Sequence, residues 1–316
     1  MRPWLELARV SNLATCVSNT MTGIALGLAV RIPPGDPDGD VAALAVGTHG
    51  GSPASVPFRW DILATAAPAI IALYIAGMIL NDLLDSAVDI TERPQRPLPS
   101  GRISRRGAAI GLGLCVLVAA GAIAFLSIPA AIAAASLLCF IVAYDLLHQK
   151  SETTVLLLGI CRALIYAVAA AATAWPLEPL PLAVFGSALL LYVVGLSVVA
   201  RVEAEKTTGG SGLGGRRFAS LLLLFPPFLP LFIMQPEQGW APLLLSGLGL
   251  MLWLQYAASA LLSTPPRIGR AVAAWIAGIC LVDAVFLSIL DRPIPALVAV
   301  GCFTLTVLAQ RRIPGT

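Results

Sequence analysis

The feature that most constrains the fold is a series of apolar segments, each roughly 20 residues long, that recurs along most of the chain. A helix of about 20 apolar residues crosses the hydrocarbon core of a bilayer. Only 12% of the residues are charged and 58% are hydrophobic, whereas about a quarter of a soluble domain is charged. The alternating pattern of a membrane barrel is absent. The sequence therefore predicts an all-α, polytopic transmembrane bundle.

We expect about nine or ten spans and a single membrane domain over residues 1–316. A loop rich in Pro, Gly and Asp is expected at 31–59 and a polar loop at 83–106. A second polar loop is expected at 201–217. The expected spans lie near residues 10–30, 60–82, 107–126, 128–148, 153–174, 180–200, 218–234, 240–262, 271–290 and 293–310.

The distribution of positive charge predicts the orientation. If the N-terminus is cytoplasmic and the spans alternate, most of the 20 Lys and Arg residues fall in cytoplasmic segments, as the positive-inside rule requires. Both polar loops, 83–106 and 201–217, then lie on the cytoplasmic side and are expected to line one pocket mouth together. We predict an integral protein of a bacterial inner membrane.

The most polar stretch of the chain is NDLLDSAVDITERPQRPLPSGRISRR, at residues 81–106. Steps of three and four residues place Asn81, Asp82, Asp85 and Asp89 on one face of a helix. A carboxylate in hydrocarbon costs about 2.5–3.5 kcal/mol, so these side chains are expected to face water, a polar cavity or a cation. Oxygen ligands of this kind suit Mg²⁺, which commonly joins carboxylates to substrate phosphates.

Arginines follow the carboxylates at once. Arg93, Arg96 and Arg102 are the candidates for binding a diphosphate, because guanidinium groups bind phosphate oxygens bidentately. Arg105 and Arg106 either bind phosphate or only set the membrane topology. Interspersed prolines are expected to end the helix and stiffen the loop. The pattern predicts a magnesium–diphosphate site.

This motif, NDxxDxxxD followed by RPQRPLPSGRIS, resembles the first aspartate-rich motif and loop of the UbiA superfamily of intramembrane prenyltransferases. The resemblance implies a bundle of about nine helices around a central cavity. It also implies magnesium-dependent transfer of a prenyl group from a prenyl diphosphate to an aromatic or other lipophilic acceptor. Asn81, Asp82, Asp85 and Asp89 would take the first magnesium–diphosphate role. Asn12 resembles a residue at the start of the family's first span and is a substrate-binding candidate.

The second aspartate-rich motif of the family departs from its pattern here. The corresponding stretch reads SVVARVEAEKTTGG, and Arg201 and Glu205 stand where two aspartates would be expected. Glu205 is predicted to hold magnesium, and Arg201 to contact the diphosphate in place of a cation. An ordinary charged helix end is the alternative. The altered motif resembles a divergent bacterial branch that includes the EboC-like proteins.

Three further candidates come from the resemblance. Lys150 would contact the diphosphate, Tyr144 would line the cavity, and Arg162 resembles the arginine of a GxxR feature that begins at Gly159. Arg162 is assigned to substrate binding, with charge pairing inside the span as the alternative.

Other polar residues receive no assigned role. His49 and His148 are expected to have no partners and no catalytic role. Asp283, in a late apolar run, either forms internal hydrogen bonds or faces the cavity.

The sequence thus predicts an enzyme whose ligands are Mg²⁺, a prenyl diphosphate and a lipophilic acceptor, in contact with the lipid bilayer and with no nucleic acid. No protein partner is inferred. One alternative is a non-catalytic membrane carrier or binding protein for a prenyl lipid. Another is a related enzyme whose acceptor is a polyol or a lipid head group.

Overall fold

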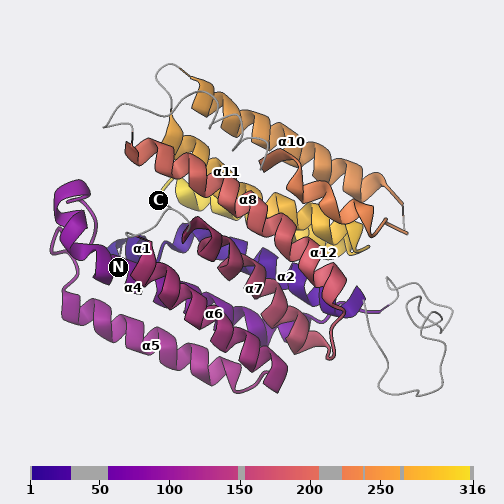
Figure 1. The fold of residues 1–316 in the computed structure, drawn as a ribbon, viewed down its shortest axis with the longest axis horizontal. Helices are drawn as coiled ribbons and strands as arrows, with labels where there is room; N and C mark the ends of the chain where they lie inside the picture. The colour runs from indigo at the N-terminus through magenta and orange to yellow at the C-terminus, as the bar shows by residue number, and fades with distance from the viewer. Residues whose placement is uncertain are drawn as a thin grey trace.

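A computed structural model of the chain describes residues 2–29, 56–148, 154–205, 223–237, 239–263 and 267–313, and for residues 199–205 and 262 it describes the backbone alone. The described residues form helices without strands. The long helices run side by side as a bundle, and both chain termini lie toward the same end of it (Figure 1). In chain order the elements are α1 (Arg2–Leu7), η1 (Val10–Asn12), α2 (Leu13–Ala29), α4 (Trp60–Glu92), α5 (Arg105–Ile123), α6 (Ile128–Leu147), α7 (Val155–Thr173), α8 (Pro179–Glu205), η5 (Pro226–Phe232), α10 (Ala241–Leu262), α11 (Ile268–Ile289) and α12 (Pro293–Gln310).

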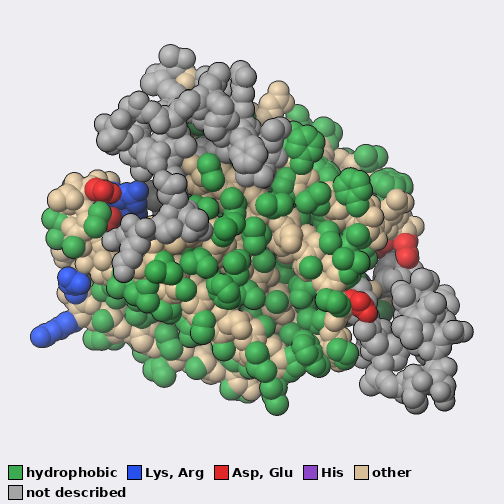
Figure 2. All heavy atoms as spheres, in the orientation of Figure 1, with side chains coloured by type: hydrophobic (Ala, Val, Ile, Leu, Met, Phe, Trp, Pro, Cys, Tyr) green, Lys and Arg blue, Asp and Glu red, His purple; other side chains and the backbone are tan. Residues whose placement is uncertain are grey.

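Eight of the described helices are long and apolar enough to cross a membrane. The apolar helix α2 adds 17 residues. The face seen in Figure 2 is covered by hydrophobic side chains, and the charged groups lie near its margins. The predicted all-α, polytopic membrane fold is therefore confirmed.

Helix α11 forms the centre of the larger core. Within the most apolar stretch of each helix, 89% of α11 is buried, compared with 11% of α5. Trp275 and Phe286 of α11 are buried with Tyr166 of α7 and Phe185 of α8. Helix α5 instead packs along α4 at the periphery, and most of its apolar surface is left for lipid.

Small residues let α2 and α7 approach closely. A Cβ atom at Gly23 would lie 2.6 Å from Ala169 Cβ, and one at Gly27 would lie 2.7 Å from the carbonyl oxygen of Ala170. Association in lipid depends on such close packing, because the hydrophobic effect does not drive helices together there. The contact fixes α2 beside the helix that carries Arg162.

Helix α4 is longer than the sequence analysis predicted. It runs for 33 residues to Glu92, so the expectation of a loop from residue 83 is wrong, and the loop covers residues 93–104. Residues 83–92 contain neither Gly nor Pro, and the first helix breaker is Pro94. The aspartates therefore lie within a helix. Likewise α8 continues to Glu205, so the start of the expected loop at 201–217 is helical.

The span expected at 218–234 also differs. Its described part, residues 223–234, contains the 3-10 helix η5 in place of a long α-helix. Pro226, Pro227 and Pro230 explain this, since proline lacks the backbone donor and clashes with the preceding turn of an α-helix. The segment packs on α8 and α11.

Candidate functional site

The last three turns of α4 present the predicted carboxylates to the interior of the protein. Asp82 and Asp89 are each only 4% exposed, and Asn81 and Ser86 are also buried. Leu84 and Ile90, on the other side of the same turns, are exposed. The prediction that the acidic side chains share one helical face is confirmed.

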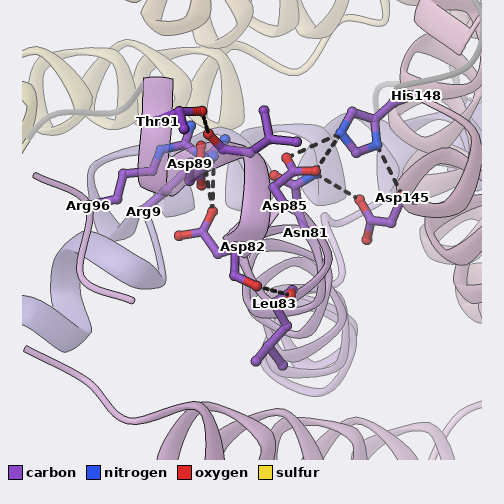
Figure 3. A network of polar contacts seen from close by, with 12 residues as sticks. Arg9, Asn81, Asp82, Leu83, Asp85, Asp89, Thr91, Arg96, Asp145 and His148 are labelled. Atoms are coloured by element: carbon purple, nitrogen blue, oxygen red, sulfur yellow. Dashed lines mark hydrogen bonds and ion pairs between the residues drawn. The ribbon is translucent and has the colours of Figure 1, made fainter. Parts of the chain in front are cut away.

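Two arginines lie against this acidic face (Figure 3). Arg96 Nη1 is 2.6 Å from Asp89 Oδ2 and 3.6 Å from Asp82 Oδ1. Arg9 Nη2 is 3.5 Å from the same Asp82 oxygen. Arg9 stands between α1 and η1 with a left-handed φ of 44°, a conformation that costs energy for a residue other than glycine. The chain break at Arg9 thus brings a guanidinium to Asp82.

The arginine loop is held by apolar anchors and a helix cap. Leu98 and Ile103 are buried in a small core with Leu7 and Ile79. The backbone N–H of Gly107 donates a hydrogen bond to Ser104 Oγ at 3.0 Å, which caps α5 as Ser at this position is expected to do. These contacts fix the loop over the end of α4 and aim Arg96 inward.

A second polar group joins α4 to the end of α6. His148 Nε2 lies 3.0 Å from Asp85 Oδ1, and Nδ1 lies 3.1 Å from the backbone oxygen of Asp145. The side chain of Asn81 donates to Asp145 Oδ1 at 3.3 Å, and the Tyr144 ring stacks on His148 at 5.4 Å. The expectation that His148 has no partner is wrong. Its spacing, one turn after Tyr144, was the available signal.

The hydrogen bond that the His148 ring donates to the Asp85 carboxylate raises the pKa of His148 above its ordinary value, and this effect outweighs the opposing effect of burial. A carboxylate next to the ring favours the charged imidazolium. Asp85 is thereby held beside the Asp82 and Asp89 group by a residue from another helix.

The acidic group has unused ligand capacity. Within the described part of the chain, Asp82 Oδ1 and Asp145 Oδ2 are buried without a hydrogen-bond partner, which is costly unless something binds there. No cluster of three or more metal-binding side chains is found among the described residues. Mg²⁺ commonly takes only one or two carboxylates and completes its shell with water and substrate phosphates. The donor set therefore fits Mg²⁺ with a diphosphate.

Other predicted residues have different surroundings. Arg102 Nη1 binds Glu6 at 2.7 Å and its Nη2 donates to the carbonyl oxygen of Gln95, so these contacts point toward α1 and the loop itself. Arg93 is exposed at the end of α4. Asn12 is buried and accepts a hydrogen bond from Gln310 of α12 at 3.3 Å.

Arg162 lies deeper in the bundle. Its Nη1 donates to Thr15 Oγ1 and Asn19 Oδ1, each at 3.0 Å, and its guanidinium lies over the Tyr74 ring at 5.6 Å. The structure thus supplies Arg162 with partners from α2. Of the two alternatives for Asp283, internal hydrogen bonding is the one observed, and its side chain is fully buried. Its donors are Ser18, Asn19, Thr22 and Tyr166.

The side chains of three predicted residues lie outside the described part of the structure. Lys150 lies outside the described residues, and the side chains of Arg201 and Glu205 do as well, although their backbone belongs to α8. Most of the predicted loop at 201–217 is also outside the described residues.

The fold and site together define an integral membrane protein with carboxylates and arginines gathered at one end of a helical bundle. The model of the UbiA prenyltransferase family matches residues 43–279. The chain belongs to this family.

Two relatives by sequence are archaeal digeranylgeranylglyceryl phosphate synthases. The protein from Methanopyrus kandleri is 34% identical over 127 residues, which cover 37% of this chain and 36% of the relative. The protein from Haloquadratum walsbyi is 38% identical over 84 residues, 27% of this chain and 29% of the relative. The chain thus aligns with about a third of the length of these curated relatives.

Two solved structures share the fold over nearly the whole chain. The apo structure of a UbiA homolog from Aeropyrum pernix K1 gives a TM-score of 0.63 at 15% identity, and the match covers 90% of this chain and 96% of that one. A structure from a study of digeranylgeranylglyceryl phosphate synthase in membranes gives 0.56 at 20% identity, covering 92% and 98%.

Proposed function

We propose that this protein transfers a prenyl group from a prenyl diphosphate to a lipophilic acceptor in the membrane, with magnesium as cofactor. The observation that carries the proposal is the buried Oδ1 of Asp82, which has no hydrogen-bond partner but has two guanidinium groups within 3.6 Å. A carboxylate placed in this way suits a cation, and the adjoining arginines suit an anion.

The carboxylates and the arginines have different roles in this proposal. Asp82, Asp85 and Asp89, with Asn81, would hold magnesium, and bound magnesium neutralises negative charge on the departing diphosphate. Arg96 and Arg9 pair with the carboxylates. A diphosphate competes for the same guanidinium groups, and its oxygens match them bidentately. Electrostatic stabilisation of the leaving group is the main catalytic contribution.

In the reaction, the allylic C–O bond breaks and its electron pair leaves with the diphosphate. A new bond forms between the prenyl carbon and the acceptor atom, and the acceptor loses a proton, which the departing diphosphate takes up. The membrane-facing apolar helices favour the prenyl chain over water, which limits hydrolysis of the reactive carbon.

The acceptor we propose is a hydroxyl group of a glyceryl phosphate lipid. The name of the sequence relatives denotes a product with two geranylgeranyl groups on glyceryl phosphate. This corresponds to the lipid head-group alternative among the acceptors. An aromatic acceptor is the competing outcome.

The remaining candidate residues belong to the same proposal. Glu205 would complete the metal side of the site, and Arg201 and Lys150 would contact the diphosphate. Arg102 and Arg93 would bind an outer phosphate oxygen, and Tyr144, Asn12 and Arg162 would line the substrate path. We place the site at the cytoplasmic face of the cytoplasmic membrane, because the arginine loop carries the strongest positive charge.

The proposal is tested with the full chain in proteoliposomes that contain magnesium and a radiolabelled prenyl diphosphate. A glyceryl phosphate lipid and an aromatic acceptor are supplied in separate reactions. Asp82→Asn is expected to lower diphosphate release and product formation about 100-fold or more. Asp61→Asn is the matched control, since Asp61 lies exposed at the other end of α4 and pairs with Arg59.

Full release by Asp82→Asn would show that the site is assigned wrongly. Tight binding of the prenyl diphosphate without release, with every acceptor supplied, would favour a carrier. Mass spectrometry of the product separates the two acceptor classes.

A further inference from the structure

A separate hollow lies outside the carboxylate site, where α1 meets α4 and α5. It is an apolar groove of about 550 Å³ beneath the N-terminal helix α1. Trp4 and Leu5 of α1, Ile79 of α4, and Ile110 and Leu114 of α5 line it. Nothing in the proposed prenyl transfer uses this groove.

Glycines of α5 let the Trp4 ring of α1 approach closely at one wall of the groove. Gly107 and Gly111 both line the groove, and a Cβ atom at Gly111 would lie 2.9 Å from the Trp4 ring. Helix α1 is amphipathic: Arg2 and Glu6 pair on one side, Leu7 is buried, and Trp4 and Leu5 are each about 40% exposed. Such a helix lies in the plane of the membrane interface, with its aromatic ring at head-group level.

Positive charge stands at one end of the groove. Arg106, Ile110 and Leu114 follow one another at steps of four residues, so they form one ridge along α5. Arg105 and Arg106 are exposed. Across the described residues neither arginine takes part in a salt bridge. A free arginine pair therefore stands one turn above an apolar slot.

We propose that this groove binds an anionic glycerophospholipid, with one hydrocarbon chain along α5 and the phosphate at Arg105 and Arg106. Basic residues at the end of membrane helices attract anionic head groups, and the purely apolar slot accepts the chain. The two charges at the rim distinguish this ligand from a neutral lipid.

The lipid site adjoins the arginine loop of the carboxylate site. Glu6 of α1 binds Arg2 on its own helix and Arg102 of the loop. A lipid held beneath α1 therefore supports the helix that pairs with Arg102. The inference concerns binding alone and stands independently of the proposed transfer reaction.

The test uses the full-length protein in nanodiscs of equimolar phosphatidylglycerol and phosphatidylcholine, and native mass spectrometry counts the lipids that stay bound. The wild type is expected to retain phosphatidylglycerol in preference to phosphatidylcholine. Arg105→Gln with Arg106→Gln is expected to weaken that preference about tenfold or more. Arg311→Gln with Arg312→Gln is the matched control, because it removes an exposed arginine pair that follows α12.

A second variant tests the groove itself. Leu114→Trp fills the slot at a lipid-exposed position and is expected to reduce bound phosphatidylglycerol while the arginines remain. Equal losses from both arginine pairs would reduce the effect to general membrane charge and overturn the proposal. Unchanged retention in Leu114→Trp, or displacement of the bound lipid by a prenyl diphosphate, would overturn it as well.

Discussion

His148 Nε2 lies 3.0 Å from Asp85 Oδ1, although the two residues are 63 positions apart and belong to different helical segments. The other ring nitrogen faces the backbone oxygen of Asp145, which only accepts hydrogen bonds. Both ring nitrogens thus face acceptors, an arrangement that the doubly protonated imidazolium satisfies best. The pair joins α4 to the end of α6 at the carboxylate site.

This pair predicts a pH-dependent contribution to stability. The pKa of His148 is raised in the folded protein, so the pair stabilises below the ordinary histidine pKa and the stabilisation is lost as pH rises through the folded-state pKa. His148→Gln should therefore lower the melting temperature at about pH 5.5 and have little effect at about pH 9. The effect should be about 1 kcal/mol, because the pair is only partly shielded from solvent, with 16% of the His148 side chain exposed.

The measurement is thermal unfolding in detergent after treatment with EDTA, so that metal binding to Asp85 does not contribute. A difference between His148→Gln and the wild type that stays constant across pH would contradict the prediction.

Arg96 connects two carboxylates, and activity should depend on the planar shape of its guanidinium group as well as on its charge. It contacts Asp89 at 2.6 Å and Asp82 at 3.6 Å through one nitrogen. Arg96→Gln should lower kcat/KM for the prenyl diphosphate about 100-fold, and Arg96→Lys should recover only part of the loss, since an ammonium group lacks the planar fork. Arg59→Gln, which removes an exposed ion pair with Asp61, should leave kcat/KM unchanged. Full recovery of kcat/KM by Arg96→Lys would argue against bidentate binding, because an ammonium group keeps the charge without the fork.

The fully buried carboxyl group of Asp283 should be important for stability. Oδ2 accepts hydrogen bonds from Ser18 and Asn19, and Oδ1 accepts them from Thr22 and Tyr166. Asp283→Ala removes the acceptor of Asn19 and Tyr166 in a fully buried region, whereas Ser18 and Thr22 also have backbone acceptors. Each unsatisfied buried group costs about 1–3 kcal/mol. We expect a loss of about 3 kcal/mol or more.

The graded variant Asp283→Asn keeps one acceptor oxygen and should lose about half as much. Unfolding in detergent measures both, with the exposed Ser259→Ala as control. Similar losses for the alanine and asparagine variants would show that the hydrogen-bond count does not set the cost.

The packing of α2 on α7 gives a comparison of two glycines. A Cβ atom at Gly23 would lie 2.7 Å from the carbonyl oxygen of Tyr166, whereas one at Gly121 would meet nothing within 4 Å. Gly23→Ala should destabilise by about 1–3 kcal/mol because the helices must separate. Gly121→Ala should be neutral or stabilising by up to about 1 kcal/mol, since alanine favours helix. The melting temperatures of the two variants test this comparison. A melting temperature of Gly23→Ala equal to that of the wild type would show that α2 and α7 shift easily.

The class of fold was predictable because each apolar run carries its own evidence of a membrane helix. The face shared by Asp82, Asp85 and Asp89 followed from helical periodicity. The end of α4 was placed too early because the predicted span ended where the acidic residues begin, although residues 83–92 contain neither Gly nor Pro. The prolines of η5 were visible in the sequence, but the apolar composition around them suggested a regular span.

By itself, the sequence determined that the fold is a helical membrane bundle, which residues share a face of α4, and that arginines follow those carboxylates. These are local properties, since they depend on residues a few positions apart. Only the tertiary structure decided that His148 pairs with Asp85, that Arg9 joins Asp82, and that Asp283 is satisfied from α2 and α7. Those partners come from helices distant in sequence, and no periodicity records which helix packs against which.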